Sequence, residues 1–147
     1  MERGTAVHAA LEGIEWIDPS APRDDLERRI LATEMAAAFT RPAGLAGLWR
    51  ERSFEIVSGG RWTSGQFDRV VFTGSGEGRR AAIYDFKTNR KMRGESDQDF
   101  AQRMRETYSG QMAAYREAVR SLTGIPPENI TAALLLVENG SVVSSEL

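Results

Sequence analysis

The sequence predicts an α/β fold in which helices flank a central mixed β-sheet. Three strand-like segments follow one another at about residues 48–57, 65–72 and 80–87, which indicates an antiparallel meander. A helical segment from about residue 98 to residue 122 comes next, and it leads into the apolar stretch "ITAALLLVE". A long helix that returns the chain to another buried strand makes the sheet mixed and places helices against it.

The other elements follow from helical periodicity and from chain breakers. Residues 3–16 predict a short helix, because Val7, Leu11 and Ile14 are spaced for one face. A second helix should run from residue 24 to residue 39, where "RPAGLAG" ends it. The polar stretch "NRKMRGESDQ" predicts a mobile loop after the third strand, and "NG" before "SVVSS" predicts a hairpin near the end of the sequence.

Composition places the chain among soluble globular proteins of a single domain. The 147 residues are enough for one hydrophobic core, and 41% apolar and 27% charged residues are ordinary values. No apolar run is long enough to cross a bilayer and no secretory signal is visible, so we expect no membrane partner. The absence of cysteine excludes disulfides, thiolate metal sites and a cysteine-ligated iron–sulfur cluster, and it suits a reducing cytoplasm.

The net charge of −2, from 21 acidic and 19 basic residues, argues against binding of nucleic acid by bulk electrostatics. Any basic surface must therefore be local, and the best candidate lies between residues 79 and 105. Its basic residues are Arg79, Arg80, Arg90, Lys91, Arg93, Arg103 and Arg105. Because acids are interleaved among them, this segment is either a track for phosphates or a plain solvated face.

The stretch "AAIYDFKTNR" combines a buried strand with two charged side chains at its end. Side chains of a strand alternate between faces, so Asp85 and Lys87 point the same way and Phe86 points the other. Adjacent strands of a meander can bring Asp68 onto the same face as Asp85 and Lys87, and two adjacent carboxylates repel each other unless a cation lies between them. Mg²⁺ or Mn²⁺ prefers such oxygen ligands, and the lysine can orient a water or neutralise charge on a phosphate. The alternative is a surface ion pair between Asp85 and Lys87.

Three further polar residues bear on this interpretation. His8 is the one histidine of the chain, and a single histidine on a helix is more often structural than a ligand. Gln111 and Tyr115 are spaced i and i+4, so they share one face of the predicted long helix. That face is otherwise apolar, which is unusual for a glutamine that only packs, whereas Tyr115 alone is readily explained as a core residue.

Taken together, the segments "RGTAVH", "WRERSF", "GQFD", "IYDFKT" and "GQMAAY" resemble the motifs of the AddA/RecB-type nuclease domain, a branch of the PD-(D/E)xK, restriction-endonuclease-like superfamily. The resemblance covers essentially the whole chain in the family's order. It implies a restriction-endonuclease-like core, one nuclease domain over residues 1–147, and magnesium-dependent exonuclease digestion of single-stranded DNA, with manganese as a substitute. It also implies double-strand-break processing for recombinational repair in the bacterial cytoplasm, beside the helicase portion of a longer chain and a helicase–nuclease partner subunit.

The resemblance assigns the catalytic residues position by position. Asp68 and Asp85 match the two acids of the second and third strands, and both are implied to be catalytic metal ligands. His8 and the backbone carbonyl of Phe86 are implied to be further ligands of the metal. Lys87 matches the catalytic lysine of the family.

The resemblance also covers residues around this set. Gln111 and Tyr115 match a pair that contacts DNA or supports the active site, and Glu51 matches an acid whose role is open. Glu12, one turn after His8, could join the outer shell of the metal, although a surface position is the simpler explanation. The proline of the superfamily's name is replaced here by Phe67, at a position where the branch commonly varies.

Two alternatives to a nuclease remain at this point. A catalytically inactive module could keep the fold and bind DNA ends, and a plain structural domain could carry the same charges as surface ion pairs. The intact set of His8, Asp68, Asp85 and Lys87 argues against the first, and the co-occurrence of five motifs argues against the second. "GSGEGRR" lacks the lysine spacing and the strand-to-helix setting of a phosphate loop, so it predicts a hairpin turn and no motor in this chain.

Overall fold

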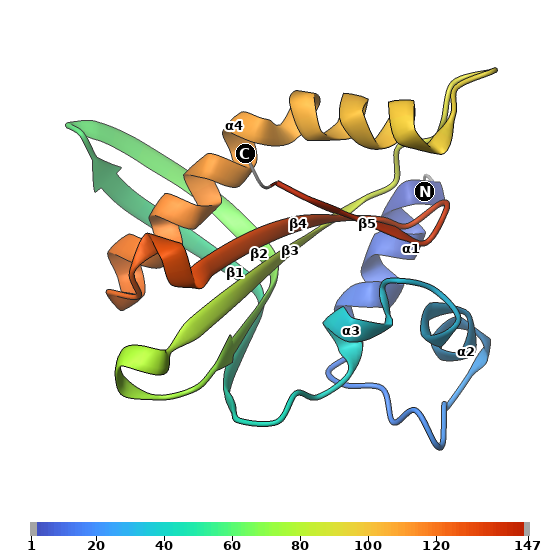
Figure 1. Cartoon of the computed structure of the whole chain (residues 1–147), viewed down its shortest axis with the longest axis horizontal. Coiled ribbons are helices and arrows are strands. Elements are labelled where there is room, and N and C mark those ends of the chain that lie inside the picture. Colours follow the sequence, from blue (N-terminus) through green and yellow to red (C-terminus); the bar gives the residue numbers. More distant parts are fainter. Residues whose placement is uncertain (1–2, 146–147) are drawn as a thin grey trace.

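The computed structural model of the chain describes residues 3–145 and confirms an α/β fold built on one five-stranded sheet (Figure 1). Short 3₁₀ turns at Gly76–Gly78 and Pro127–Asn129 precede β3 and β4. The helices and strands, in chain order, are α1 (Arg3–Glu12), α2 (Asp25–Leu31), α3 (Ala36–Phe39), β1 (Leu45–Ser58), β2 (Arg61–Thr73), β3 (Arg80–Lys87), α4 (Asp97–Thr123), β4 (Ile130–Leu136) and β5 (Ser141–Ser144).

The strands lie in the order β1–β2–β3–β4–β5, so their spatial order follows the chain. β1, β2 and β3 form the predicted antiparallel meander, β3 and β4 are parallel, and β4 and β5 are antiparallel. A parallel pair requires a crossover connection, and α4 supplies it. The prediction of a mixed sheet is therefore confirmed.

The two faces of the sheet carry different helices. α4 lies along one face, and α1, α2 and α3 gather on the other (Figure 1). Alternation along β3 divides its side chains between the two cores. Ile83 belongs to the cluster under α4, together with Phe67, and Phe86 belongs to the opposite cluster, together with Leu11 and Phe39.

α4 follows the predicted range closely because both of its ends are capped. The Ser96 side chain accepts a hydrogen bond from the backbone N–H of Asp99, and Gly124 adopts a φ of 76° after the last turn. Within residues 3–145, no helix combines the length and the apolar character that a membrane crossing requires. The buried side chains of α4 are Phe100, Met104, Met112, Tyr115, Ala118 and Val119.

The helical segments before the sheet are shorter than predicted. The expected helix over residues 24–39 is two helices, because the Thr33 hydroxyl donates to the carbonyl of Ile30 and accepts from the N–H of Met35. These local hydrogen bonds compete with the helical ones and interrupt the helix. The first helix ends at Glu12 rather than at residue 16.

The polar loop between β3 and α4 is anchored at Glu95. Its carboxylate accepts hydrogen bonds from the Arg103 guanidinium and from the backbone N–H of Met92. The hydrogen bond from Arg103 is the largest reason why the pKa of Glu95 is lowered to about 2. The mobility expected for this loop stays a prediction.

β1 and β2 extend beyond β3 as a two-stranded β-arm, residues 52–67, which projects from the sheet in Figure 1. Its turn is formed by Gly59 and Gly60 with φ values of 58° and 75°, and positive φ at both positions is typical of a tight type I′ turn. Phe54 and Ile56 are buried on the α4 side of the arm, which ties it to the body of the domain.

Candidate active site

The site is built around an irregularity in the pairing of β1 with β2. The ladder contains the pairs Arg50↔Arg69 and Arg52↔Phe67 but omits the pair of Glu51 with Asp68 between them, and Glu51 has a φ of 48°. A positive φ is uncommon for a residue other than glycine and marks a departure from regular strand geometry. At this point the side chains of the strands change the face of the sheet to which they point.

Two consecutive residues of β2 consequently face the α1 side. Phe67 and Val70 both pack in the core under α4, although their spacing of three would place them on opposite faces of a regular strand. Between them, Asp68 contacts His8, and Arg69 donates hydrogen bonds to the backbone carbonyls at positions 14, 15 and 38. The irregularity thus directs a carboxylate and a buried guanidinium toward the N-terminal helices.

Asp68 lies where the pairing of β2 with β3 has stopped. The last pair in that ladder is Arg69↔Tyr84, and beyond it the backbone N–H of Phe86 donates to Oδ2 of Asp68 over 2.8 Å. The carboxylate therefore takes the place that a backbone carbonyl of β2 would occupy. Because the N–H and C=O of a strand residue point to the same side, the Phe86 carbonyl also faces this gap.

Asp85 and Lys87 reach the gap from the α4 side, as the alternation along β3 predicts, whereas Asp68 reaches it from the α1 side. The prediction that the three share one face is therefore wrong, because the irregular pairing at Glu51 turns Asp68 toward α1. Asp85 is 3% exposed, and Lys87 Nζ lies 2.8 Å from its Oδ2 atom. This contact is an ion pair without hydrogen-bond geometry, and within the described residues the buried Oδ2 atom accepts no hydrogen bond. A buried carboxylate oxygen that accepts no hydrogen bond is available as a ligand for a cation.

The two carboxyl groups perturb each other. The pKa of Asp68 is raised to about 7, first because burial disfavours the charged form and then because Asp85 hydrogen-bonds and repels it. The N–H of Phe86 and the charge of His8 act in the opposite direction. Two acids this close, one of them with a strongly raised pKa, have the electrostatics of a cation site.

Lys87 is held by side chains of α4. Its Nζ atom donates to Oε1 of Gln111 over 2.9 Å and lies 4.0 Å from the centre of the Tyr108 ring. The Gln111 amide donates to the Tyr115 hydroxyl over 3.0 Å, and this hydroxyl donates to the carbonyl of Gln66 over 3.1 Å. The chain of hydrogen bonds fixes the amide so that its oxygen faces the ammonium. Gln111 and Tyr115 therefore support the lysine.

Tyr115 remains a neutral donor in this network. Its pKa is raised to about 12, mainly because the ring is buried and further because Asp85 and Asp68 disfavour a second negative charge. Tyr108 in turn donates to the side chain of Asn89 over 3.1 Å. The sequence gave no signal for Asn89 or for the Gln66 carbonyl.

α1 contributes the other side of the site. His8 Nε2 lies 3.0 Å from Oδ1 of Asp68, and His8 Nδ1 lies 2.7 Å from Oε1 of Glu12. The imidazole also meets the Phe86 ring edge-on, with 5.4 Å between ring centres. A carboxylate on one ring nitrogen orients the imidazole and leaves the other nitrogen to face the site. Glu12 is thus a partner of His8 and not an isolated surface residue.

Glu51 joins the same group of acids. Its pKa is raised, mainly by a hydrogen bond with Glu12 and then by burial and by the charge of Glu12, while His8 lowers it. Its open role therefore has a location beside Glu12, at the rim of the site. Helical spacing placed Glu12 beside His8, but the sequence could not place Glu51, because its approach to Glu12 depends on the irregular backbone at Glu51.

The assembled side chains fit a divalent metal ion. His8, Glu12 and Asp68 each offer a ligand atom, and these atoms all lie within 4.8 Å of one another. Asp85 and the Phe86 carbonyl approach the same gap from β3. Mixed carboxylate, carbonyl and imidazole ligands suit Mg²⁺ and, with the imidazole, Mn²⁺.

Several basic side chains of the segment at residues 79–105 form local ion pairs. Arg90 pairs with Glu138 at 3.0 Å, Lys91 with Asp97 at 2.7 Å, and Arg103 with Glu95 at 2.8 Å. Of the two explanations that the sequence left open, these pairs favour a solvated face over a phosphate track.

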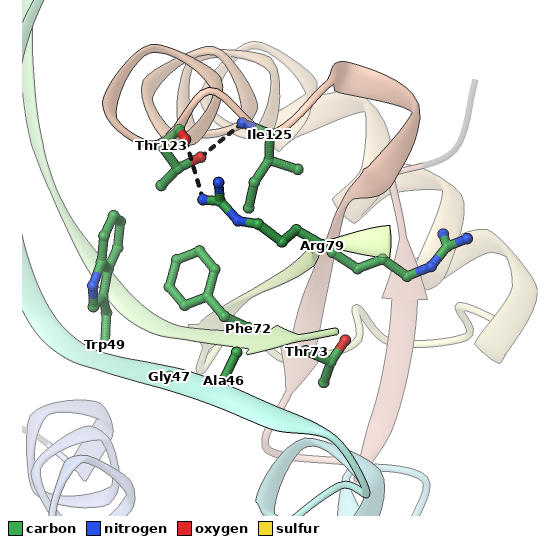
Figure 2. Close-up of a pocket in the computed structure, with 9 residues that line it drawn as sticks. Ala46, Gly47, Trp49, Phe72, Thr73, Arg79, Thr123 and Ile125 are labelled. Atoms are coloured by element: carbon green, nitrogen blue, oxygen red, sulfur yellow. Dashed lines mark hydrogen bonds between the residues drawn. The ribbon is translucent and has the colours of Figure 1, made fainter. Parts of the chain in front are cut away.

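A pocket at the far end of α4 is also a poor place for the phosphodiester. It measures about 240 Å³ and is lined by Trp49, Phe72, Arg79, Thr123 and Ile125, among others (Figure 2). Arg79 donates to the carbonyl of Thr123 over 3.1 Å and so compensates the C-terminal end of the helix. Among the residues that line this pocket there is no carboxylate to hold a metal, whereas the gap between β2 and β3 carries the acids that a metal needs.

Comparison with known families agrees with this geometry. Residues 20–146 match the family model of the PD-(D/E)XK nuclease superfamily, a range that includes Asp68, Asp85 and Lys87 and begins after His8 and Glu12. The chain has no significant match among curated proteins. The mixed sheet with helices on both faces is consistent with the restriction-endonuclease-like fold. With the two acids and the lysine inside the matched range, the chain belongs to the PD-(D/E)XK nuclease superfamily, whose members are nucleases that use divalent metal ions.

Proposed function

We propose that the chain is a Mg²⁺-dependent deoxyribonuclease of the AddA/RecB type that digests single-stranded DNA from an end. The observation that carries this proposal is the meeting of Asp68, Asp85 and Lys87 in the gap between β2 and β3. Membership of the nuclease superfamily supports phosphodiester hydrolysis. The branch, the exonuclease mode and the preference for single strands rest on the motif resemblance.

The metal would be held by His8, Asp68, Asp85 and the carbonyl of Phe86. When bound, the cation supplies a Lewis acid for the phosphate and lowers the pKa of a bound water. The chain's own contribution is to fix the ligands. The N–H of Phe86 holds one oxygen of Asp68, and Glu12 orients the imidazole of His8.

Lys87 supplies a localised positive charge on the α4 side. Asp85, Gln111 and the Tyr108 ring surround the ammonium, so it loses little freedom when a phosphate arrives. A fixed charge of this kind stabilises the negative charge that develops on the phosphate oxygens. Its 16% exposure leaves one side of the group accessible from the gap.

The biological setting that we propose rests on the motif resemblance. We place the domain, residues 1–147, beside the helicase portion of a longer chain and a partner subunit. In that setting it would process double-strand-break ends for recombinational repair in the bacterial cytoplasm.

The proposal is tested by digestion of end-labelled single-stranded DNA in magnesium, in manganese and in chelator. We expect short products in either metal with the wild-type chain, none in chelator, and none with Asp85→Asn. A closed circular single strand is the matched substrate without an end, and it should stay intact. Cleavage of the circle at the rate of the linear strand would contradict the exonuclease mode. DNA binding in calcium without hydrolysis in magnesium would identify a catalytically inactive DNA-end-binding module instead.

A further inference from the structure

The β-arm has one covered face and one uncovered face. Phe54 and Ile56 turn toward α4, and their strand partners Gly65 and Thr63 lie on the same side. The uncovered face carries six exposed side chains, which alternate with these along both strands. They are Ser53, Glu55, Val57, Trp62, Ser64 and Gln66.

An indole stands at the tip of this uncovered face. Trp62 is 66% exposed and pairs across the arm with Val57, which is 60% exposed. The tight turn at Gly59 and Gly60 lies beside the indole, and Phe54 and Ile56 anchor the base of the arm on the α4 side. Tryptophan side chains are usually largely buried, so an exposed one paired with an exposed valine indicates a contact surface.

Polar groups and a hollow lie between the tip and the candidate active site. A shallow, widely open hollow of about 680 Å³ lies here, and its lining residues are Ser53, Phe54, Glu55, Ser64, Gly65 and Gln66. Within residues 3–145, the side chains of the four polar residues among them make no hydrogen bond or ion pair, so their donors and acceptors are open to a ligand.

This face leads to the catalytic acids. Positions 62, 64, 66 and 68 of β2 alternate onto the same side, so Trp62 and Asp68 belong to one row of side chains. Six residues of strand at about 3.3 Å each separate them by ~20 Å. That span corresponds to about six stacked nucleotides at 3.4 Å each, and to fewer in an extended strand.

The chemistry of the face suits nucleobases better than phosphates. None of its six side chains is basic, and Glu55 repels phosphates while it can accept hydrogen bonds from amino groups of bases. A duplex hides its base faces and presents phosphates, whereas a single strand exposes bases that stack on aromatic rings. The uncovered face is also continuous with the site where the phosphodiester would be cut.

We propose that the uncovered face of the β-arm is a base-binding subsite for single-stranded DNA, with Trp62 as the stacking platform. This inference rests on the proposed nuclease function and adds the surface that selects an unpaired strand. Trp62 contacts the substrate at a distance from the scissile bond, so its contribution depends on the length of the strand.

The test compares wild type with Trp62→Ala, Trp62→Phe and the control Leu122→Ala, which removes another exposed apolar side chain, 49% exposed, from α4. KM is measured in magnesium on a single strand of about 12 nucleotides, on a dinucleotide and on a blunt duplex. Trp62→Ala should raise the single-strand KM about 5- to 150-fold, the equivalent of about 1–3 kcal/mol per stacked base. Trp62→Phe should lose less, and Leu122→Ala and the dinucleotide constants should not change.

Several results would overturn the proposal of a base-binding subsite. One is an unchanged single-strand KM in Trp62→Ala, and another is an equal rise of KM on the dinucleotide or on the duplex. A self-association of wild type that Trp62→Ala abolishes, with unchanged DNA constants, would make the face a contact between copies. Failure of the nuclease proposal is a different outcome, because wild type would then hydrolyse none of the three substrates.

Discussion

The two sides of the active site are built in different ways. On the lysine side, α4 surrounds Lys87 with an amide, a phenol ring and a carboxylate, and each of these groups is itself held by a further hydrogen bond or by burial. On the histidine side, His8 contacts Glu12 and Asp68, Glu51 hydrogen-bonds with Glu12, and the N–H of Phe86 holds one oxygen of Asp68. The lysine side places a cation among its partners, whereas the histidine side collects acids that a cation would neutralise. In the proposed nuclease, α4 would hold the charge for the phosphate, and α1, β2 and β3 would supply the ligands of the metal.

The strongest way to separate the two sides is to remove the lysine. Lys87→Ala should reduce hydrolysis by at least about 100-fold, because a fixed charge at the phosphate is lost, while metal binding persists. Hydrolysis of labelled single-stranded DNA and calorimetric titration of manganese measure the two properties. Lys91→Ala is the control, since that lysine forms an exposed pair with Asp97. Loss of metal binding in Lys87→Ala would show that the ammonium also positions the metal ligands.

The next largest effect concerns the support of that lysine. Gln111→Ala removes a hydrogen bond to a charged group, which is worth about 1.5–3 kcal/mol, so activity should fall about 10- to 100-fold. The melting temperature should change little, because Gln111 contributes little buried apolar surface. Gln102→Ala on the outer side of α4 is the control, since the Gln102 side chain is exposed and hydrogen-bonds with its helix neighbours Glu106 and Arg105. If Gln111→Ala unfolds the domain and the remaining folded protein is fully active, the residue is structural.

Metal should stabilise the histidine side measurably. At a hundredfold excess over Kd, an ion that binds only the folded state adds about 2.7 kcal/mol, which raises the melting temperature by several degrees. Melts in chelator, magnesium and manganese should show this gain in wild type and in the control Glu128→Gln, an exposed acid remote from the site. Asp85→Asn should lose most of the gain. Equal metal shifts in wild type and Asp85→Asn would place the ion elsewhere.

In chelator, the crowding of acids should make stability depend on pH. Because the folded-state pKa of Asp68 is raised from 3.8 to about 7, the folded form binds the proton more tightly than the unfolded form. Asp68 therefore does not lower the free energy of unfolding below pH 3.8, and it lowers that free energy increasingly as the pH rises toward about 7. Asp68→Asn should be more stable than wild type at pH 8, and the difference should shrink toward pH 4. A difference that is independent of pH would contradict the raised pKa.

The smallest effect should distinguish two ions at the imidazole. His8→Ala should weaken the manganese-induced rise in melting temperature more than the magnesium-induced one, because imidazole suits the softer ion. Paired melts in both metals measure the difference. Equal weakening would mean that His8 orients Asp68 without serving as a ligand.

Local periodicity predicted much of the fold and part of the site. Alternation along β3 was sufficient to put Asp85 and Lys87 on one side and Phe86 on the other, and helical spacing was sufficient to pair Gln111 with Tyr115. These relations depend only on the geometry of one element. The meander and the return through α4 followed in the same way.

The contacts between elements could not be predicted in this way. That Gln111 meets Lys87 depends on how α4 docks on the sheet, and that Glu51 meets Glu12 depends on one residue with a positive φ. The break after Thr33 depends on a side-chain hydroxyl that competes with the helix. Such features are set by tertiary packing, which a single sequence does not reveal by periodicity.

The buried guanidinium of Arg69 has a consequence for any attempt to shorten the chain. It is 1% exposed, and its acceptors are the carbonyls of Ile14, Glu15 and Ala38. A fragment trimmed to begin at residue 20, where the superfamily match begins, would lose two of these three acceptors together with His8. A buried cation deprived of partners is strongly destabilising. The minimal folding unit therefore starts upstream of the region by which the superfamily is recognised.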